Sequence, residues 1–405
     1  MKCFLIAKKL SHSFSKPIHN ALADYSYEYK ELLENELEDF LKERDFDGLN
    51  VTIPYKSAVM EYLDEISPEA QKIGAVNTIV NKDGKLCGYN TDYYGYCYLA
   101  KEAGVEISGR DVVIIGRGGA SKTVKCVCED MGAKSVRLIT REDMASGEMS
   151  RFYDAQIVVN ATPVGMYPNT GESAVDITQF KKCEAVHELI YNPAKTKLIL
   201  DAQKMGIKTA NGLGMLVAQA KAACEIFTGK EVPNLKIEKI RQKIEKQTKN
   251  IILIGMPGCG KSSVGKEMAK ILERPFYDCD EEITKKGESP SELIEKYGEA
   301  HFRSIESDML AELCKMSGCI IATGGGAVTI ERNYDLIHQN GVVLFIDRPL
   351  ERLATEGRPL SRGGIEHLQK MQEIRMPLYK KFADAQVASL ETYQKTAQQA
   401  IKILE

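Results

Sequence analysis

The sequence predicts an α/β protein built from doubly wound parallel sheets. A buried strand, a glycine-rich turn and the start of a helix follow one another twice, at 110–121 and at 251–272. Around these units, short apolar runs typical of strands alternate with helical patterns. This alternation predicts parallel sheets with ligand crevices at the carboxyl ends of the strands. The length of 405 residues fits two or three domains.

Composition narrows the class of protein before any motif is considered. A hydrophobic content of 43% and a charged content of 27% are typical of a soluble globular protein. The net charge of −3 argues against nucleic acid or an anionic membrane as a partner. The eleven cysteines lie at irregular spacings without paired C-x-x-C sets, which indicates free thiols in a reducing cytosol. No run approaches the roughly 20 apolar residues of a membrane span, and the first apolar run is too short for a signal peptide. We therefore expect a cytoplasmic protein. Its composition is compatible with either a monomer or a homodimer and does not select between them.

Polar side chains follow several predicted strands in the first hundred residues. The strand at 3–7 runs into a hydroxyl-rich turn, and three more strand ends carry hydroxyl or amide groups. Hydroxyls at such places often only cap a helix, and for the first cluster alone this is the better interpretation. Four such clusters together predict a pocket for a polyhydroxylated small molecule, in which Lys56 and Asp92 supply proton-transfer chemistry. The clusters are Ser13-Phe14-Ser15, Asn50 to Lys56, Gly74 to Thr78 and Gly88 to Asp92.

A nucleotide-binding unit is predicted next in the chain. The strand Arg110–Ile115 leads into the turn Gly116 to Ser121, and a second strand follows at Ser135–Thr140. An acidic residue at the end of that second strand would select NAD, whereas this chain has Thr140-Arg141 there. An arginine suits the 2′-phosphate of NADP. Glu142 beside it is a contrary signal, and a solvated surface charge is the alternative interpretation of Arg141.

Further elements complete the first half. Strands are predicted at 155–160 and 185–191, and a helix begins near Gly212. The charged stretch 229–250 has apolar residues at helical spacing, which predicts a closing helix followed by a very short linker.

The first 230 residues resemble the shikimate dehydrogenase family, whose signatures they match in order. These are Ser13-Phe14-Ser15, Asn50 to Lys56, Ala75 to Thr78, Asn90 to Asp92, Gly116 to Ser121, Asn160 to Met166 and Gly212 to Gln219. The resemblance implies NADPH-dependent reduction of 3-dehydroshikimate to shikimate, with Lys56 and Asp92 as the catalytic pair. It implies a substrate domain at 1–92 and 213–246 and a Rossmann-type NADP domain at 93–212. The implied substrate residues are Ser13, Ser15, Asn50, Thr52, Asn77, Tyr191 and Gln219. The implied NADP residues are Gly116, Gly118, Gly119, Ala120, Ser121, Thr140, Arg141, Thr162, Gly212 and Met215.

The chain departs from the family pattern at three places. Lys8-Lys9-Leu10 replaces the Gly and Pro that commonly precede the serine motif. Thr140-Arg141-Glu142 replaces the usual Asn-Arg-Thr, and Glu188 replaces the usual Asp before the Tyr-x-Pro motif.

A phosphate-binding loop opens the second half. Gly255 to Ser262 fits G-x-x-x-x-G-K-[ST] and lies between an apolar strand and a helical pattern. Backbone N–H groups and the helix N-terminus then converge on phosphate oxygens. Lys261 would reach the outer phosphates and the Ser262 hydroxyl would bind Mg²⁺. This half is therefore predicted to bind a nucleoside triphosphate.

Later signals predict the acceptor side of a phosphoryl transfer. A strand at 275–280 would place Asp278 and Asp280 on one side of its end, one for Mg²⁺ and one for an acceptor hydroxyl, although capping aspartates remain an alternative. Arg303 and Glu306 fall on one helix face. Three glycines at 324–326 allow close approach of a ligand, and a polar segment around Arg358 suits a lid.

The second half, from residue 250 to 405, resembles the shikimate kinase family in Asp278-x-Asp280, Phe302-Arg303-x-x-Glu306, the three glycines, Arg358-Pro359-Leu360 and Arg375-x-Pro377-Leu378-Tyr379. The resemblance implies phosphorylation of shikimate with ATP and Mg²⁺, with Asp280 at or near the general base. Lys261 and Arg358 act on the transferring phosphate. The implied substrate residues are Asp280, Arg303, Gly324, Gly325, Gly326 and Arg375. The implied ATP residues are Gly258, Cys259, Gly260, Lys261, Ser262, Ser263, Arg352 and Arg358, and the implied metal residues are Ser262 and Asp278. Cys259 stands where Ser or Ala is commoner, and a small unreactive filler is favoured over a redox-sensitive thiol.

The two resemblances support each other, because the product of the first reaction is the substrate of the second. We therefore expect a bifunctional enzyme on the route to chorismate and the aromatic amino acids, acting on 3-dehydroshikimate, shikimate, NADPH and ATP. One alternative is a first half that oxidises quinate or shikimate with NAD. Another is a metabolite sensor without turnover, although such a protein should have lost Lys56, Asp92, Lys261 or Asp280, and all four are present. Channelling of shikimate between the sites stays a hypothesis.

Overall fold

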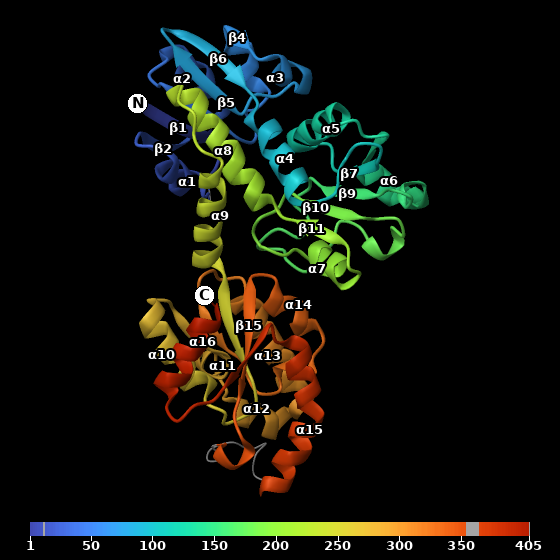
Figure 1. Ribbon diagram of the computed structural model, residues 1–405, viewed down its shortest axis with the longest axis vertical. Helices are drawn as coiled ribbons and strands as arrows, with labels where there is room; N and C mark the ends of the chain where they lie inside the picture. Colours follow the sequence, from blue (N-terminus) through green and yellow to red (C-terminus); the bar gives the residue numbers. More distant parts are fainter. Residues whose placement is uncertain (11–12, 354–363, 405) are drawn as a thin grey trace. The chain divides into compact units, whose positions relative to one another are not determined.

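The computed structural model describes residues 1–10, 13–353 and 364–404 (Figure 1). Its chain divides into two compact units, Met1–Lys243 and Ile244–Glu405. The boundary falls inside helix α9 (Leu235–Thr248), so the last turn of this helix belongs to the second unit. The division of the first half into 1–92 with 213–246 and 93–212 stays a prediction. No helix in the described part of the chain is long and apolar enough to cross a membrane.

A mixed sheet forms the first part of the first unit, in the strand order β2-β1-β3-β5-β6-β4. β5 runs antiparallel to both β3 and β6, and the other neighbours pair in parallel. Asp83 and Gly84 join β5 to β6 with positive φ angles of 52° and 87°, as a tight hairpin turn requires. The strands are β1 (Lys2–Ala7), β2 (Ser26–Glu31), β3 (Gly48–Val51), β4 (Glu65–Ile66), β5 (Thr78–Lys82) and β6 (Lys85–Tyr89).

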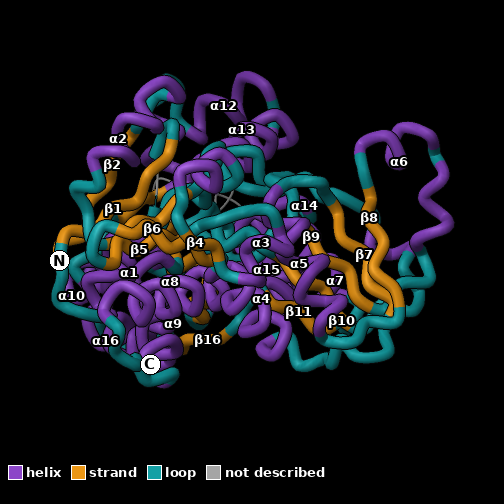
Figure 2. The backbone as a smooth tube through the Cα atoms, turned by 90° about the horizontal axis from the view of Figure 1, so that it is seen from above, coloured by secondary structure: helices purple, strands orange, loops and turns teal. Residues whose placement is uncertain are grey.

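A parallel sheet forms the second part of this unit, in the order β11-β10-β9-β7-β8. The strands follow the apolar runs of the sequence but are up to three residues shorter. The largest difference is in β10, which ends at Glu188, where the buried carboxylate accepts the backbone N–H of Ile190 at 3.1 Å. β7 and β8 run side by side in Figure 2, and α6 follows β8 directly. The strands are β7 (Asp111–Ile115), β8 (Ser135–Ile139), β9 (Ile157–Asn160), β10 (Ala185–Glu188) and β11 (Lys208–Ala210).

Helices α4 and α8 cross closely in the first unit. A Cβ on Gly95 of α4 would lie 2.8 Å from the backbone oxygen of Met215 in α8, so only a glycine fits at this crossing. Residues of both helices line the polar cavity described below. The helices of this unit are α1 (Ser15–Leu22), α2 (Leu37–Glu43), α3 (Pro68–Ile73), α4 (Thr91–Glu102), α5 (Gly119–Asp130), α6 (Arg141–Ser146), α7 (Lys197–Lys204), α8 (Gly212–Thr228) and the start of α9.

The second unit is a parallel sheet in the order β13-β14-β12-β15-β16, with helices packed around a core of buried apolar side chains. Its strands are β12 (Asn250–Ile254), β13 (Phe276–Asp278), β14 (Ile320–Ala322), β15 (Gly341–Asp347) and β16 (Ala385–Ala388). Its helices are α10 (Lys261–Leu272), α11 (Cys279–Lys285), α12 (Pro290–Tyr297), α13 (Glu299–Leu313), α14 (Arg332–His338), α15 (Gly364–Phe382) and α16 (Tyr393–Leu404).

The predicted strand at 275–280 is wrong in its second half. β13 ends at Asp278, and α11 begins at Cys279. Asp278 caps α11, because its Oδ1 accepts the backbone N–H of Asp280 at 3.0 Å and of Glu281 at 3.4 Å. Asp280 therefore lies in the first turn of a helix. The two carboxylates do not share one side of a strand end.

Candidate active sites

A cavity of about 460 Å³ in the first unit collects the polar strand ends predicted from the sequence. Strands of the mixed sheet, α4, α8 and loops of the parallel sheet all contribute to its wall. Its lining includes Lys56, Asp92, Ser13, Ser15, Asn50, Thr52, Asn77, Tyr191 and Gln219, together with Ala120, Gly212 and Met215 from the predicted nucleotide residues. Residues from seven separate stretches of sequence thus meet at one place.

Lys56 and Asp92 form a direct ion pair in this cavity. The Lys56 Nζ donates to Asp92 Oδ2 at 2.6 Å, and the side chains are 22% and 14% exposed. Lys56 follows β3, whereas Asp92 lies in the first turn of α4, where the helix dipole favours a carboxylate. The pair has the proximity that proton transfer to a bound carbonyl oxygen requires.

Amide side chains around the pair are held by one another. The Nδ2 of Asn50 donates to Thr78 Oγ1 at 3.1 Å, and its Oδ1 accepts the Tyr27 hydroxyl at 2.8 Å. Asn77 Oδ1 accepts the backbone N–H of Thr91 at 2.7 Å. Thr91 Oγ1 in turn lies 3.4 Å from Gln219 Oε1. This network fixes the rotamers of predicted substrate residues before any ligand binds.

The serine motif forms another edge of the cavity. The Ser13 Oγ donates to Ser15 Oγ at 3.0 Å and accepts the Ser15 backbone N–H at 3.1 Å. Tyr191 packs its ring 5.8 Å from that of Phe14. Lys9, which belongs to the segment that replaces the Gly and Pro of the family pattern, also lines the cavity. It places a cationic side chain on the same wall as the two serine hydroxyls.

The glycine-rich turn after β7 is built for a close backbone approach. Gly116 has a φ of 116°, and a Cβ there would lie 3.1 Å from both Ser121 Oγ and Thr162 Cγ2. Gly118 precedes the first turn of α5, and a Cβ on Gly118 or Gly119 would meet nothing within 4 Å. The open space before a helix N-terminus is the geometry that accepts a pyrophosphate.

Two predicted nucleotide residues lie at the end of β8. Thr140 caps α6, because its Oγ1 accepts the Asp143 backbone N–H at 3.4 Å while Asp143 Oδ2 accepts the N–H of Thr140 at 2.8 Å. Arg141 is exposed at the start of α6. Neither residue lines the substrate cavity, and their role in NADP binding stays a prediction.

Sequence reasoning missed several residues of this cavity. Tyr27, Leu5, Leu189 and Leu216 all line it. Tyr27 belongs to β2, whose pairing with β1 brings it beside Asn50 of β3. This contact results from the strand order, and no local sequence pattern around residue 27 predicts it.

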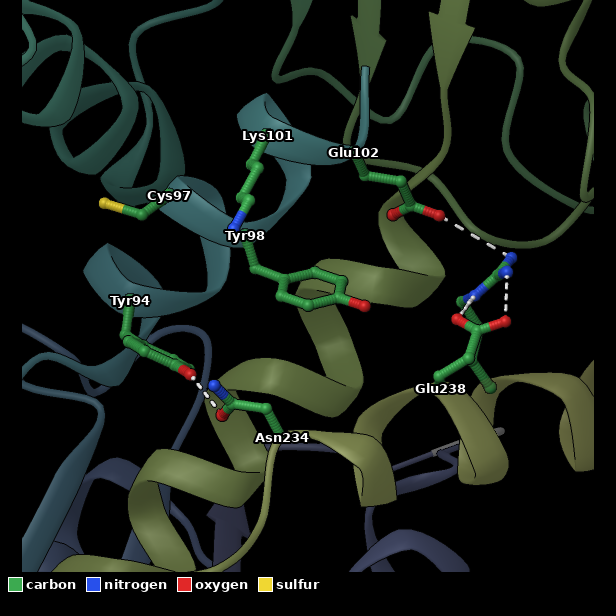
Figure 3. Close-up of a pocket in the computed structure, with 8 residues that line it drawn as sticks. Tyr94, Cys97, Tyr98, Lys101, Glu102, Asn234 and Glu238 are labelled. Carbon is green, nitrogen blue, oxygen red and sulfur yellow. Dashed lines mark hydrogen bonds and ion pairs between the residues drawn. The ribbon is translucent and has the colours of Figure 1, made fainter. Parts of the chain in front are cut away.

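Figure 3 shows a second cavity of the first unit, about 630 Å³ in volume, beside α4. The Tyr94 hydroxyl donates to Asn234 Oδ1 at 3.2 Å. Arg241 lies 3.6 Å from Glu102 and 2.9 Å from Glu238. These polar groups pair with one another, so we assign no ligand to this cavity. These contacts link both ends of α4 to the segment 234–241, which includes the first half of α9.

The phosphate loop of the second unit joins β12 to α10. Gly255, Gly258 and Gly260 have φ angles of 148°, 80° and 98°, which L side chains rarely adopt. The Lys261 ammonium is buried and donates to the backbone oxygens of Gly255 at 2.9 Å and Met256 at 3.1 Å. The loop thus holds its lysine folded back over its own backbone. Cys259, in its middle, is fully buried.

The Ser262 hydroxyl contacts the carboxylate that ends β13. Its Oγ donates to Asp278 Oδ2. A hydroxyl and a carboxylate oxygen beside a phosphate loop are the hard oxygen ligands that Mg²⁺ prefers. No cluster of three acidic, histidine or cysteine ligands occurs in the described part of the chain.

Two buried arginines, Arg303 and Arg375, are the residues predicted for the acceptor side of this site. Arg303 Nη1 donates to Glu306 Oε2 at 2.8 Å, and its Nη2 donates to Glu299 at 2.7 Å. Arg375 lies 4.0 Å from Glu299, while its buried Nη1 makes no hydrogen bond to any described residue. Burial raises the pKa of the Glu306 carboxyl although Arg303 opposes this shift. A buried guanidinium N–H without a partner indicates a position for an anionic ligand.

The three glycines after β14 bring these parts together. A Cβ on Gly326 would lie 2.2 Å from Arg303 Cζ, and one on Gly325 would lie 2.7 Å from Pro257 of the phosphate loop. A Cβ on Gly324 would meet the Glu306 carboxylate at 1.9 Å. Only glycines fit between the arginine pair and the phosphate loop. The Tyr379 hydroxyl closes the turn by donating to the Gly325 oxygen at 2.5 Å.

Sequence reasoning missed two residues that lie beside the phosphate loop. The Tyr393 ring lies over Gly260, where an added Cβ would be 2.7 Å from its Cε1. Arg348 donates from Nη1 to the Tyr393 hydroxyl at 3.4 Å. Arg352 is exposed after β15, and Arg358 lies outside the described residues. Tyr393 comes from α16, more than 130 positions after the loop, so no local signal relates the two.

The two sites define two classes of enzyme. The lysine–aspartate pair beside a Rossmann-type nucleotide turn is typical of an oxidoreductase. The phosphate loop facing an arginine pair is typical of a P-loop phosphotransferase.

Comparisons with known proteins agree with both classes. Family models match at residues 5–79 (shikimate dehydrogenase substrate binding domain), 212–245 (shikimate 5′-dehydrogenase C-terminal domain) and 257–405 (shikimate kinase). The NADP(+) shikimate dehydrogenase of Clostridium perfringens is 39% identical over 268 residues, which cover 60% of this chain and 99% of the relative.

Solved structures are similar over the same part of the chain. A chorismate mutase/shikimate 5-dehydrogenase fusion protein from Clostridium acetobutylicum is 36% identical with a TM-score of 0.56, and the match covers 60% of this chain and 97% of that one. Shikimate 5-dehydrogenase from Thermus thermophilus in complex with NADP(H) and shikimate is 30% identical with a TM-score of 0.53, covering 60% and 99%.

The chain belongs to the shikimate dehydrogenase family over its first unit and carries a shikimate kinase domain in its second. It is a bifunctional enzyme of the shikimate pathway.

Proposed function

We propose that the first unit reduces 3-dehydroshikimate to shikimate with NADPH and that the second phosphorylates shikimate at its 3-hydroxyl with ATP. Lys56 and Asp92 carry the first reaction, and Lys261, Asp280 and the arginine pair carry the second. The single observation that supports this best is that all seven expected substrate residues line one cavity together with the Lys56–Asp92 pair.

In the first site, bound NADPH supplies a hydride to the carbonyl carbon of the substrate. Lys56 donates a proton to the carbonyl oxygen, and Asp92 orients the ammonium through the 2.6 Å contact. Asn50, Asn77 and Gln219 hold ring hydroxyls, while Ser13 and Ser15 bind the carboxylate. Arg141, exposed beyond the nucleotide turn, is free to pair with the 2′-phosphate.

In the second site, Arg303 and Arg375 clamp the shikimate carboxylate, and Asp280 receives or relays the proton of the acceptor hydroxyl. Lys261 leaves its backbone contacts to reach the outer phosphates once ATP binds. When bound, Mg²⁺ neutralises phosphate charge, and Ser262 and Asp278 are the residues that would hold it directly or through water. The expected action of Arg358 on the transferring phosphate stays a prediction.

A cofactor-resolved assay on the purified full-length chain tests this proposal. Shikimate is oxidised with NADP⁺ or with NAD⁺, and in a separate reaction it is phosphorylated with ATP and Mg²⁺. We expect both activities, with a clear preference for NADP⁺. Absence of shikimate oxidation with either nucleotide would refute the dehydrogenase part, and a preference for NAD⁺ would refute the role of Arg141.

A further inference from the structure

Glu188 is a fully buried carboxylate at the end of β10, and the reaction described above does not use it. Its Oε1 accepts the backbone N–H of Ile190 at 3.1 Å, and its Oε2 accepts the Thr196 hydroxyl at 2.9 Å. The Nδ2 of Asn160 reaches both oxygens at 3.0 Å. These four hydrogen bonds compensate the buried carboxylate for its lost hydration and hold it in a defined position.

The hydrogen-bond partners of Glu188 connect it to the nucleotide turn on one side and to the substrate cavity on the other. On one side, Asn160 Oδ1 accepts the backbone N–H of Thr162 at 3.1 Å and its hydroxyl at 2.7 Å. Thr162 in turn faces Gly116 of the nucleotide turn. On the other side, Ile190 immediately precedes Tyr191, whose side chain lines the substrate cavity.

We propose that Glu188 is a positioning residue that couples nucleotide binding to substrate binding, by fixing the turn at Asn160–Thr162 and the turn at Ile190–Tyr191 to one another. This inference rests on the proposed function of the first unit. Glu188 touches neither substrate nor nucleotide. It acts through Asn160 and through the backbone at Ile190.

The charged form of Glu188 is the one that fits its surroundings. Each of its four contacts comes from a donor, so a protonated carboxyl would turn an O–H toward other donors. Burial nevertheless raises the pKa of Glu188 to about 7. The network should therefore weaken as the pH falls below neutrality.

The ionisable groups near Glu188 have partners of their own, and the contacts below do not involve its carboxylate. His187 contacts the Tyr96 hydroxyl with its Nδ1 at 3.0 Å, and burial lowers the pKa of His187 to about 4. On α7, which packs against β10, Lys197 pairs with Asp201 at 2.7 Å. The β9 contact of Glu188 is the neutral Asn160.

The experiment compares Glu188→Gln, Glu188→Asp and wild type in the full-length chain. The Gln amide keeps the size of Glu but presents an N–H₂ group to donors, whereas Asp keeps the charge. Glu184→Gln is the matched control, because Glu184 precedes the same strand and pairs with Arg110 and Gln156 at its other end. Kinase activity of each sample reports on the second unit, and hydrogen exchange of first-unit peptides reports on whether the unit that contains Glu188 is folded.

We expect Glu188→Gln to raise the KM for NADP⁺ and the KM for shikimate together by about 5-fold or more, with kinase activity and Glu184→Gln like wild type. Glu188→Asp should recover most of this loss. The wild-type KM for shikimate should also rise between pH 8 and pH 6, whereas that of Glu188→Gln should stay flat. Shikimate is the better reporter, because a nucleotide phosphate itself titrates near pH 6.

Three outcomes would overturn the proposal. They are an unchanged KM for either ligand in Glu188→Gln, equal damage from Asp and Gln, and a wild-type KM for shikimate that does not change between pH 8 and pH 6. The last applies even if Glu188→Gln fails to fold. Wild type without NADP⁺-dependent turnover would instead refute the proposed function, so the two failures are distinct.

Discussion

The two active sites of this chain are assembled in opposite ways. In the second unit, Lys261 and Ser262 follow directly from one strand, one turn and one helix, and Asp278 lies on the strand that comes next along the chain. In the first unit, Lys56, Asp92 and Gln219 are brought together over more than 160 positions by two sheets and the crossing of α4 with α8. A local motif identifies its chemistry by itself, whereas an assembled cavity is identified only by the sum of its parts.

The two sites also differ in the charged groups that they contain. The first site surrounds the Lys56–Asp92 ion pair mainly with amides and hydroxyls, which suits a polyol, and adds the cationic Lys9 to its lining. The second site has buried arginines held by Glu299 and Glu306 beside a phosphate loop, which suits anions on both sides of the transfer. Removing one charge should therefore impair proton transfer in the first site, whereas in the second site it should impair the binding or reaction of an anion.

The largest expected effect is in the phosphate loop. Lys261→Met should lower kinase kcat by about 100-fold or more, because it removes a fixed charge from the transferring phosphate. Dehydrogenase activity should not change. Lys266→Met is the matched control, since Lys266 lies on the same helix but is exposed and pairs with Glu281. Steady-state assays of both reactions check this, and equal loss in the control would contradict it.

The next effect concerns acid stability of the first unit. Burial lowers the pKa of His19 to about 3 and of His187 to about 4, from 6.5. The unfolded chain therefore binds protons below about pH 6.5 that the folded unit does not, and stability falls as the pH drops from there toward 4. Glu188 works in the opposite sense between about pH 4.5 and 7, because its raised pKa lets the folded unit bind the extra proton.

His187→Gln isolates one part of this effect. Between pH 7 and pH 5 the variant should lose about 2 kcal/mol less of the unfolding free energy of the first unit than wild type loses. Urea denaturation followed by peptide-resolved hydrogen exchange separates the two units. A wild-type pH slope in the variant would show that His187 does not stay neutral in the folded chain.

A smaller effect is expected at the arginine pair. Arg303→Lys keeps the charge but loses the forked geometry, so the kinase KM for shikimate should rise about 10-fold while the KM for ATP stays constant. Arg332→Lys is the control, because Arg332 is exposed and pairs with Asp308 on the surface. An effect on the KM for ATP alone would place Arg303 at the wrong substrate.

The smallest effect sharpens the contrast in charge. If Lys9 adds a cation beside the serine hydroxyls, Lys9→Met should raise the dehydrogenase KM for shikimate about 2- to 5-fold, the size of an exposed ion pair. The KM for shikimate methyl ester, which lacks the carboxylate charge, should not change. An equal rise for both compounds would exclude an ion pair with the carboxylate.

The sequence predicted the fold class and most of the strands, because apolar runs and glycine-rich turns are local signals. It placed Asp278 and Asp280 on one strand end, and this was wrong because the Asp278 side chain captures backbone N–H groups and starts a helix. Tyr27 and Tyr393 were missed, since strand order and a distant helix bring them to their sites. The roles of the site residues stay predictions, although the structure shows which of these residues lie together.

The most direct test of the whole account is Lys56→Met assayed for both reactions. Lys56 is the only predicted general acid of the first site, and it lies in a different compact unit from the phosphate loop. Lys72→Met serves as control, since its ion pair with Asp130 lies on the surface. We predict a loss of about 10² to 10⁴ in dehydrogenase kcat, with kinase activity and the control unchanged. Dehydrogenase turnover at the wild-type rate would contradict the assignment of the lysine–aspartate pair, and parallel loss of both activities would contradict two independent sites.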